Sequence, residues 1–190
     1  YNHFIVLNAD GKVYGWGYNG YGQLGLGNTS NYTTPVYLNM DNVIDITARG
    51  NYTAVLKKDG TVWMAGYNGN GELGVNSTSS QSSFVQVKNE DGTGFLTNIK
   101  DIESGINTMY AITNDGDVYA WGYNGYGQMG FGDTSSRKLP VKLNITNIKQ
   151  ISAGEHDTIA LDNNGEIWVA GRNTEGQLGL GNTTNSTVWA

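Results

Sequence analysis

A motif of about 50 residues occurs four times along this chain of 190 residues, and such a repeat is typical of folds built from successive similar units. Each copy contains a two-residue turn, Asp-Gly or Asn-Gly, followed by an aliphatic-aromatic pair and a segment that resembles Gly-Gln-Leu-Gly. The second copy is longer because of a polar, glycine-containing insertion at residues 89–95. The turns are Asp10-Gly11, Asp59-Gly60, Asp115-Gly116 and Asn164-Gly165, with spacings of 49, 56 and 49 residues.

Every copy is predicted to form short strands. In residues 53–66, TAVLKKDGTVWMAG, two apolar runs flank Asp59-Gly60, a strong β-hairpin signal because both residues tolerate a positive φ. The segments VIDIT (43–47) and IKQIS (148–152) alternate apolar and polar residues, as half-buried strands do. The sequence therefore predicts an all-β fold. The expected architecture is β-propeller blades of four-stranded antiparallel sheets, with four repeats at about 1–48, 49–104, 105–153 and 154–190 in a single domain, 1–190.

One stretch of the repeat resembles a known family. Residues 151–181, ISAGEHDTIALDNNGEIWVAGRNTEGQLGLG, are similar to the regulator of chromosome condensation repeat, in its bacterial type. That repeat has a Ser-Ala-Gly opening, an Asp-Gly hairpin, a Trp-Gly pair and an Asn-x-x-Gly-Gln-Leu-Gly loop, and the resemblance covers essentially the whole chain. It implies a propeller that typically has seven blades. Four repeats are too few for that number, so we expect either a piece of a longer protein or half of a two-chain ring.

Both ends of the repeat array look incomplete in the sequence. The first copy starts at HFIVLNADG (3–11) with no strand ahead of it, and the last ends at TTNSTVWA (183–190), where an outer strand should begin. Two chains joined edge to edge would give eight blades, within the usual range of about four to eight. Because open sheet edges tend to pair, self-association through these edges is one expected interaction.

The loop GYNGYGQLG (17–25) raises the question of nucleotide binding, because Gly15, Gly17 and Gly20 match the dinucleotide-binding spacing. Such a loop must open a helix, and a segment this rich in glycine makes a poor one. The spacing also occurs in only one copy. We therefore interpret the loop as structural: glycines allow tight turns or close approach, Asn and Gln bind loop backbone, and Leu packs inward. The residues given this role are Gly17, Asn19, Gly22, Gln23, Leu24, Gly122, Asn124, Gln128, Asn173 and Gln177.

Positions that change between copies are the better candidates for a partner site. Tyrosine provides a large contact area at low entropic cost, which suits a binding surface. The alternative is packing between blades or duplication of the repeat in pairs, and packing is the favoured interpretation for Trp16 and Trp121. The candidate partner-binding residues are Tyr18, Tyr21, Tyr67, Tyr123, Tyr126 and Arg172.

The composition argues against several kinds of chemistry. With no cysteine and two histidines, the sequence predicts neither a disulfide nor a metal site, and no catalytic residue or cofactor is expected. His156 shares a column with three asparagines and is expected to cap the blade through a hydrogen bond. The net charge is −6 and the 11 Lys and Arg residues do not cluster, so neither nucleic acid nor membrane insertion is expected. The Asn- and Thr-rich composition without cysteine favours a bacterial exported or cell-surface protein.

The family resemblance implies interaction scaffolds, which include exchange factors for a small GTPase and β-lactamase inhibitors. We therefore expect a non-catalytic module, not an enzyme, that binds another protein of unknown identity through its loop face. The alternatives are a carbohydrate or cell-surface binding module, a structural unit that assembles blade to blade, and a regulator that resembles a guanine-nucleotide exchange factor. The family's plant UV-B photoreceptor uses clustered tryptophans, whereas the five in this chain fall mostly one per blade, so the sequence does not predict that function.

Overall fold

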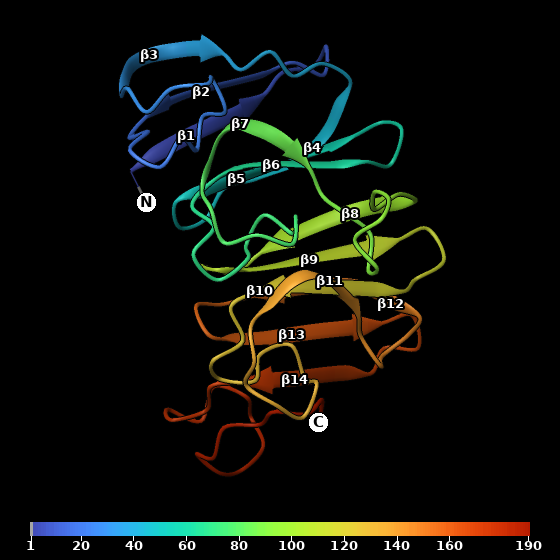
Figure 1. The fold of residues 1–190 in the computed structure, drawn as a ribbon. Coiled ribbons are helices and arrows are strands. Elements are labelled where there is room, and N and C mark those ends of the chain that lie inside the picture. Colours follow the sequence, from blue (N-terminus) through green and yellow to red (C-terminus); the bar gives the residue numbers. More distant parts are fainter. Residues whose placement is uncertain (1) are drawn as a thin grey trace.

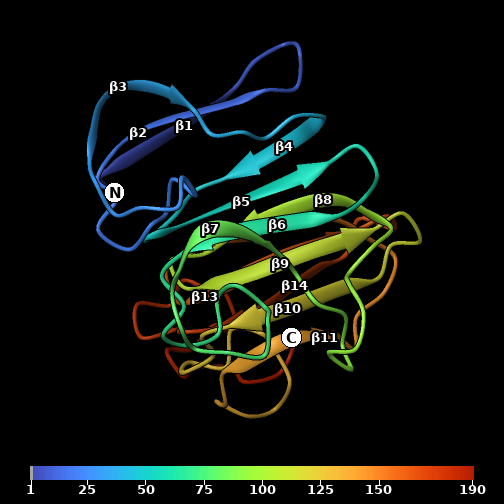
Figure 2. The same ribbon diagram turned by 45° about the horizontal axis from the view of Figure 1, so that its top comes forward.

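The computed structural model describes residues 2–190, which form fourteen strands and no helix. The strands make four antiparallel sheets, called blades 1 to 4 here in chain order. The blades follow one another from the N-terminus to the C-terminus, from top to bottom in Figure 1, and Figure 2 shows the same stack from a second direction. Blade 1 contains β1 (His3–Leu7), β2 (Val13–Gly17) and β3 (Tyr32–Tyr37). Blade 2 contains β4 (Val43–Thr47), β5 (Tyr52–Lys57), β6 (Val62–Gly66) and β7 (Gln81–Gln86). Blade 3 contains β8 (Ile99–Ser104), β9 (Thr108–Thr113), β10 (Val118–Gly122) and β11 (Arg137–Lys142). Blade 4 contains β12 (Ile148–Ala153), β13 (Asp157–Asp162) and β14 (Ile167–Gly171).

The chain is thus a partial propeller. Its two inner sheets have four strands and its two outer sheets have three, as the incomplete ends of the repeat array predict. In the described residues, blade 1 has no strand on the free edge of β1, where blades 2 and 3 carry β4 and β8. Blade 4 has only the beginning of an outer strand. Gly171 bridges Ser186, and Val169 exchanges two backbone hydrogen bonds of 3.0 and 3.1 Å with Ala190.

Each blade contains a hairpin closed at the expected Asp-Gly or Asn-Gly pair, in a loop of three residues in which only the glycine has a positive φ. In blade 2, β5 and β6 pair from Tyr52↔Gly66 to Leu56↔Val62, and Gly60 in the turn has a φ of +79°. A side chain at this φ would be strained, which explains the glycine. The same positive φ occurs at Gly11, Gly116 and Gly165. The turns of all four blades therefore follow one local design.

The hydrophobic core lies between the blades. One cluster joins blades 2 and 3 and includes Tyr52, Met64 and Trp121, all with no exposed surface. Polar bonds reinforce these junctions, because the hydroxyl of Tyr52 in blade 2 donates to the carbonyl of Gly105 in blade 3 at 2.9 Å. Two further clusters join blades 1 and 2 and blades 3 and 4. Each blade is consequently stabilised by the apolar surface that its neighbour covers.

The insertion at residues 89–95 forms a compact loop after β7. Lys88 bridges Phe95, and the backbone amide of Asn89 donates to the carbonyl of Gly94. The loop borders a cavity of about 660 Å³ shared with Asp115 in the hairpin turn of blade 3. In residues 2–190 no helix is long and apolar enough to cross a membrane.

Candidate functional site

The loops that follow β2, β6, β10 and β14 all lie at one end of the blades, called the loop face here, opposite the Asp-Gly hairpin turns. The first residue of each loop is anchored through its backbone amide. Tyr18 donates to the carbonyl of Asn2 at 2.7 Å, and Arg172 donates to that of His156 at 2.8 Å. The second and third loops repeat this bond, from Tyr67 to Asn51 and from Tyr123 to Asn107. The four candidate residues at this position therefore start from equivalent backbone positions.

A buried asparagine organises each loop. The side-chain oxygen of Asn19 accepts from the amide of Leu24 at 2.9 Å, and its amide nitrogen donates to the carbonyl of Asn28 at 3.0 Å. Asn124 and Asn173 make the same pair of bonds in blades 3 and 4. All three side chains have no exposed surface. Backbone amide and carbonyl groups of the loop that have no partner in a neighbouring strand are thus hydrogen-bonded by the asparagine of the same loop.

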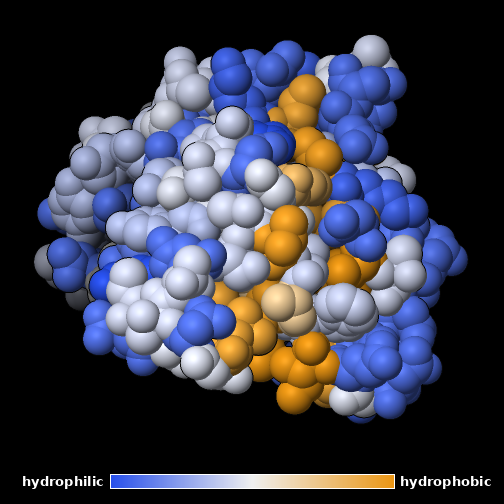
Figure 3. Space-filling model, turned by 90° about the horizontal axis from the view of Figure 1, so that it is seen from below, coloured by the Kyte–Doolittle hydropathy of each residue, from blue (hydrophilic) through white to orange (hydrophobic). Residues whose placement is uncertain are grey.

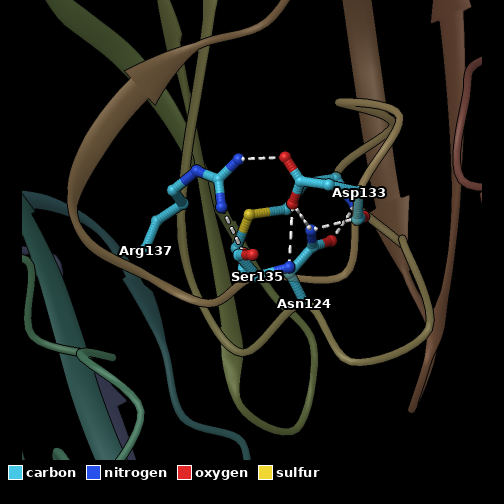
Figure 4. A network of polar contacts seen from close by, with 5 residues as sticks. Asn124, Asp133, Ser135 and Arg137 are labelled. Atoms are coloured by element: carbon cyan, nitrogen blue, oxygen red, sulfur yellow. Dashed lines mark hydrogen bonds and ion pairs between the residues drawn. The ribbon is translucent and has the colours of Figure 1, made fainter.

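The third loop shows how this network continues to the surface. Figure 4 shows Asn124 beside Asp133, whose carboxylate contacts the guanidinium of Arg137 at 2.7 Å. Asp133 also accepts from the amide of Ser135 at 2.8 Å. These bonds hold the pKa of the Asp133 carboxyl below its usual range, with the Arg137 bond as the largest cause.

The glutamine of each loop pairs with the backbone two residues before it. Gln23 and Gln128 accept from the amides of Tyr21 and Tyr126 at 3.1 Å, and both glutamines are buried. In blade 2 this position is Glu72, and burial raises the pKa of its carboxyl. Gln177 makes the same bond at 3.0 Å but is exposed, because no described blade follows blade 4.

The remaining loop residues lie where strands or blades approach closely. The backbone at Gly17 and Gly122 packs against the carbonyls of Asn2 and Asn107 within the same blade. Gly22 packs against Ser82 of blade 2, and Leu24 beside it is fully buried. The structural role of the loop residues remains our assignment, and these contacts support it.

Tyrosines from two blades form the first aromatic cluster. Tyr21 packs edge-on against Tyr67 of blade 2 with ring centroids 5.2 Å apart, and against Tyr18 at 6.2 Å. Tyr18 is 36% and Tyr21 39% exposed. The hydroxyl of Tyr18 lies over Gly20, so closely that a Cβ at this glycine would collide with it. A glycine at position 20 is therefore needed for the Tyr18 ring to adopt this position.

The second cluster joins blades 3 and 4. Tyr126 stacks on the ring of His156 at 4.4 Å, and Tyr123 lies 5.8 Å from His156 and 6.4 Å from Tyr126. The sequence places His156 in a capping column, but the bond at this position joins the Arg172 amide to the backbone carbonyl of His156, and the ring Nδ1 has no partner among the described residues. Its ring as part of an aromatic cluster was missed. Nothing in the local sequence pairs it with Tyr126, because the contact crosses from one blade to the next.

Arg172 stands apart from both clusters. Its Nε donates to Thr174 Oγ1 at 2.9 Å, and its guanidinium lies 3.9 Å from Glu175. Thr174 occupies the position of Gly20. Where the tyrosine becomes arginine, the glycine below it becomes a hydrogen-bonding residue, and the fourth loop loses its aromatic surface.

Trp121 lies inside a blade junction. It is fully buried, and its Nε1 donates to the carbonyl of Glu72 at 2.7 Å. Trp16, in the same column of blade 1, is partly buried and stacks on Phe4 at 5.6 Å. Trp121 thus packs against the loop of blade 2, and Trp16 packs against β1 of its own blade. Among residues 2–190, no group of three or more His, Cys, Asp or Glu side chains is arranged to hold a metal ion.

A run of four antiparallel blades, joined by these loops and carrying aromatic clusters on one face, defines a β-propeller repeat protein. The sequence profile of the RCC1-like domain matches residues 1–189, and the chain belongs to this family. It is 31% identical to the ultraviolet-B receptor UVR8 of Arabidopsis thaliana over 145 residues, which are 75% of this chain and 32% of that protein. It is 32% identical to the human X-linked retinitis pigmentosa GTPase regulator over 149 residues, 75% of this chain and 14% of that protein. The chain therefore spans about a third or less of the length of these curated relatives.

Solved structures show the same fold. Human WBSCR16 matches with a TM-score of 0.83 and 24% identity over 100% of this chain and 50% of that one. Prp20p from Saccharomyces cerevisiae matches with a TM-score of 0.82 and 24% identity over 100% of this chain and 48% of that one. The relatives named here are eukaryotic, so the expected bacterial, exported origin has no support from them.

Proposed function

We propose that this domain is a non-catalytic interaction module that binds another protein through the loop face. The observation that carries the proposal is the pair of aromatic clusters, Tyr18, Tyr21 and Tyr67 in one and Tyr123, Tyr126 and His156 in the other. Each is built by two neighbouring blades, so the rigid sheets fix its shape before a partner arrives. A preformed aromatic surface loses little entropy on binding and provides large contact area.

The properties of the family agree with this kind of function. RCC1-like β-propeller domains commonly act as protein-interaction modules, and yeast RCC1 (Prp20) has been solved bound to Kap60. The tyrosines also suit a protein partner chemically, because each ring joins an apolar face to a hydroxyl that can form a hydrogen bond. Arg172 is the least suited of the candidates, since it is paired within its own loop.

The test is a comparison of bound partners between matched variants. The tagged domain and its Tyr21→Ala/Tyr126→Ala variant are used to capture proteins from an extract of the source organism. Phe95→Ala is the control, because Phe95 is 54% exposed but lies at the hairpin-turn end beside Asp115. We expect a protein that is retained by the wild type and by Phe95→Ala and lost with the double variant. Equal capture by all three would refute the loop face as the binding surface.

Two alternative functions give different results in parallel assays. A carbohydrate-binding module would bind a glycan array, and the double Tyr variant would abolish that signal. A regulator related to GTPase exchange factors would accelerate nucleotide release from a small GTPase. The second alternative draws on the human GTPase regulator among the relatives and on Prp20p, whose binding properties toward Gsp1p are known.

A further inference from the structure

Several asparagines of this chain are followed directly by glycine, a pair that is prone to deamidation. Glycine has no side chain, so its backbone amide can reach the side-chain carboxamide of the asparagine before it. In a folded protein this reaction depends on how firmly the carboxamide and the glycine amide are held, because both must be free to move. The asparagines concerned are Asn19, Asn68, Asn70, Asn124 and Asn164.

Three of these asparagines are held inside the loop face. Asn19, Asn68 and Asn124 have no exposed surface, and each side-chain oxygen accepts a hydrogen bond from a backbone amide at 2.9 Å. The glycine that follows is covered as well, because the hydroxyl of the preceding tyrosine lies over it, as that of Tyr18 does over Gly20. Deamidation at these sites therefore requires the loop to open first.

Asn70 is partly exposed but is held by its neighbours. Its side-chain nitrogen donates to the carboxylate of Glu72 at 2.7 Å, and the amide of Gly71 donates to the carbonyl of Asn68 at 3.0 Å. The backbone at Gly71 also packs so closely against Lys138 of blade 3 that a Cβ would collide with it. Both reacting groups of this pair are thus restrained.

Asn164 is held much less firmly. It lies in the hairpin turn between β13 and β14, and its side chain makes a 3.4 Å bond to Asp162. The amide of Gly165 donates to the carbonyl of Asp162 at 3.2 Å, a bond that must open before the amide can reach the side chain. Exposed hairpin turns open at low cost compared with buried segments.

The exposure of Asn164 belongs to the turn itself. Asp59 and Asp115, the equivalent residues of blades 2 and 3, are exposed although their blades have a neighbour on each side. Figure 3 views the molecule from below and shows hydrophilic side chains along its right margin, the side on which Figure 1 places the hairpin turns. Water therefore reaches this turn.

The residue two positions before the turn decides what a new charge there would meet. In blade 4 this residue is Asp162, which is buried and accepts from the amides of Asn164 and Glu166 at 2.8 Å. A carboxylate at position 164 would lie beside it, and like charges repel. In the three blades that have aspartate in the turn, this residue is not acidic: Asn8, Lys57 and Thr113.

We propose that Asn164 is a site of spontaneous deamidation in the folded protein, and that the carboxylate formed there weakens the hairpin of β13 and β14. The backbone nitrogen of Gly165 loses its proton and bonds to the side-chain carbonyl carbon of Asn164, whose nitrogen leaves as ammonia. Water then opens the resulting succinimide at either of its carbonyls and leaves aspartate or isoaspartate. The overall reaction consumes water and releases ammonia, and it places a negative charge beside Asp162.

Peptide mapping by mass spectrometry, after incubation in a mildly alkaline buffer, tests the chemical step. We expect the peptide with Asn164 to be modified at least about tenfold faster than those with the other Asn-Gly pairs. In urea the rates should converge, because every pair is then free. In Asn164→Gln the corresponding peptide should stay unmodified, since glutamine cyclises far more slowly. Equal rates in the folded protein, or modification of Asn164 in urea alone, would overturn the proposal.

Hydrogen exchange of matched variants tests the effect of the charge. In Asn164→Asp we expect the amides of β13 and β14 to exchange at least about threefold faster than in the wild type, with β5 and β6 unchanged. Adding Asp162→Asn restores the combination of Asn8 with Asp10 found in blade 1, and should return the exchange to the wild-type rate. Asn164→Gln should match the wild type. Unchanged exchange in Asn164→Asp, or no rescue by Asp162→Asn, would refute repulsion from Asp162.

Discussion

Glu72 is a buried acidic residue at a loop position where the other three blades have glutamine. It occupies the column of Gln23 and Gln128, and its carboxylate accepts from the backbone amide and the side-chain amide of Asn70 at 2.8 and 2.7 Å. Burial nevertheless raises the pKa of its carboxyl above the ordinary value of 4.5. The folded state therefore binds a proton more tightly than the unfolded state. This group contributes stability at low pH and loses that contribution as the pH rises through its folded-state pKa.

Glu72→Gln should therefore raise the free energy of unfolding at neutral pH. Glutamine keeps the bond to the Asn70 amide and carries no charge to desolvate, so we expect a gain on the order of 1 kcal/mol. The gain should vanish well below pH 4.5, where the wild-type carboxyl is protonated in both states. Urea unfolding across this pH range measures it. The reverse change, Gln23→Glu, should be destabilising at neutral pH, and a pH-independent difference in either variant would contradict the explanation.

Asn124 provides the complementary case, a buried polar residue whose bonds are satisfied. In Asn124→Ala the amide of Met129 and the carbonyl of Asp133 lose their partner. Unsatisfied buried groups each cost about 1–3 kcal/mol, so we expect a loss of about 2–4 kcal/mol in the free energy of unfolding. The exposed Asn144 gives a matched control, and Asn144→Ala should change stability by less than about 0.5 kcal/mol. Similar losses in the two variants would show that the loop does not depend on Asn124.

At the scale of the element, the same type of side chain contributes differently to the free energy of unfolding in different blades. Trp121 is enclosed between blades 2 and 3 and bonded to Glu72, while Trp16 lies on the open surface of blade 1. Trp121→Phe should lower the free energy of unfolding by about 2–4 kcal/mol, because it removes a buried hydrogen bond and leaves a cavity. Trp16→Phe, the same change in the same column, should cost less than about 1 kcal/mol in a monomeric sample. Chemical denaturation measures both free energies of unfolding. Equal losses would show that the contribution of this tryptophan does not depend on whether a preceding blade covers it.

Local patterns predicted the strands and hairpins well, because they depend on residues that are close in the sequence. The Asp59-Gly60 turn and the alternation in residues 43–47 and 148–152 lie on strands or turns as expected. The repeat register also placed Trp16 and Trp121 in one column, which the strand pairings confirm.

Contacts between blades could not be predicted in this way. The packing of Tyr126 on His156 and of Tyr21 on Tyr67 depends on how one sheet is rotated against the next. The same is true of Glu72, whose backbone carbonyl accepts a hydrogen bond from Trp121 of blade 3. Aligning the repeats identifies candidate surface residues. Which of these residues contact one another depends on how neighbouring sheets are rotated against each other.

At the scale of the whole molecule, stability should be highest in the middle blades and lowest at the first. In propellers and other repeat proteins, each unit is stabilised mainly by its neighbours, so a unit with one neighbour opens more easily. The strands β5 and β9 are paired on both edges and buried on both surfaces. Among the described residues β1 pairs with β2 alone, and Phe4 and Val6 on it are exposed.

Hydrogen exchange should therefore divide the chain by blade. We expect the hydrogen-bonded amides of β1 to exchange at least about tenfold faster than those of β5 and β9 in a dilute sample, as measured by mass spectrometry of peptic peptides. β5 and β9 serve as internal controls, because no open surface borders them. Uniform exchange across all blades would mean that the four blades unfold as one unit, with no weaker first blade.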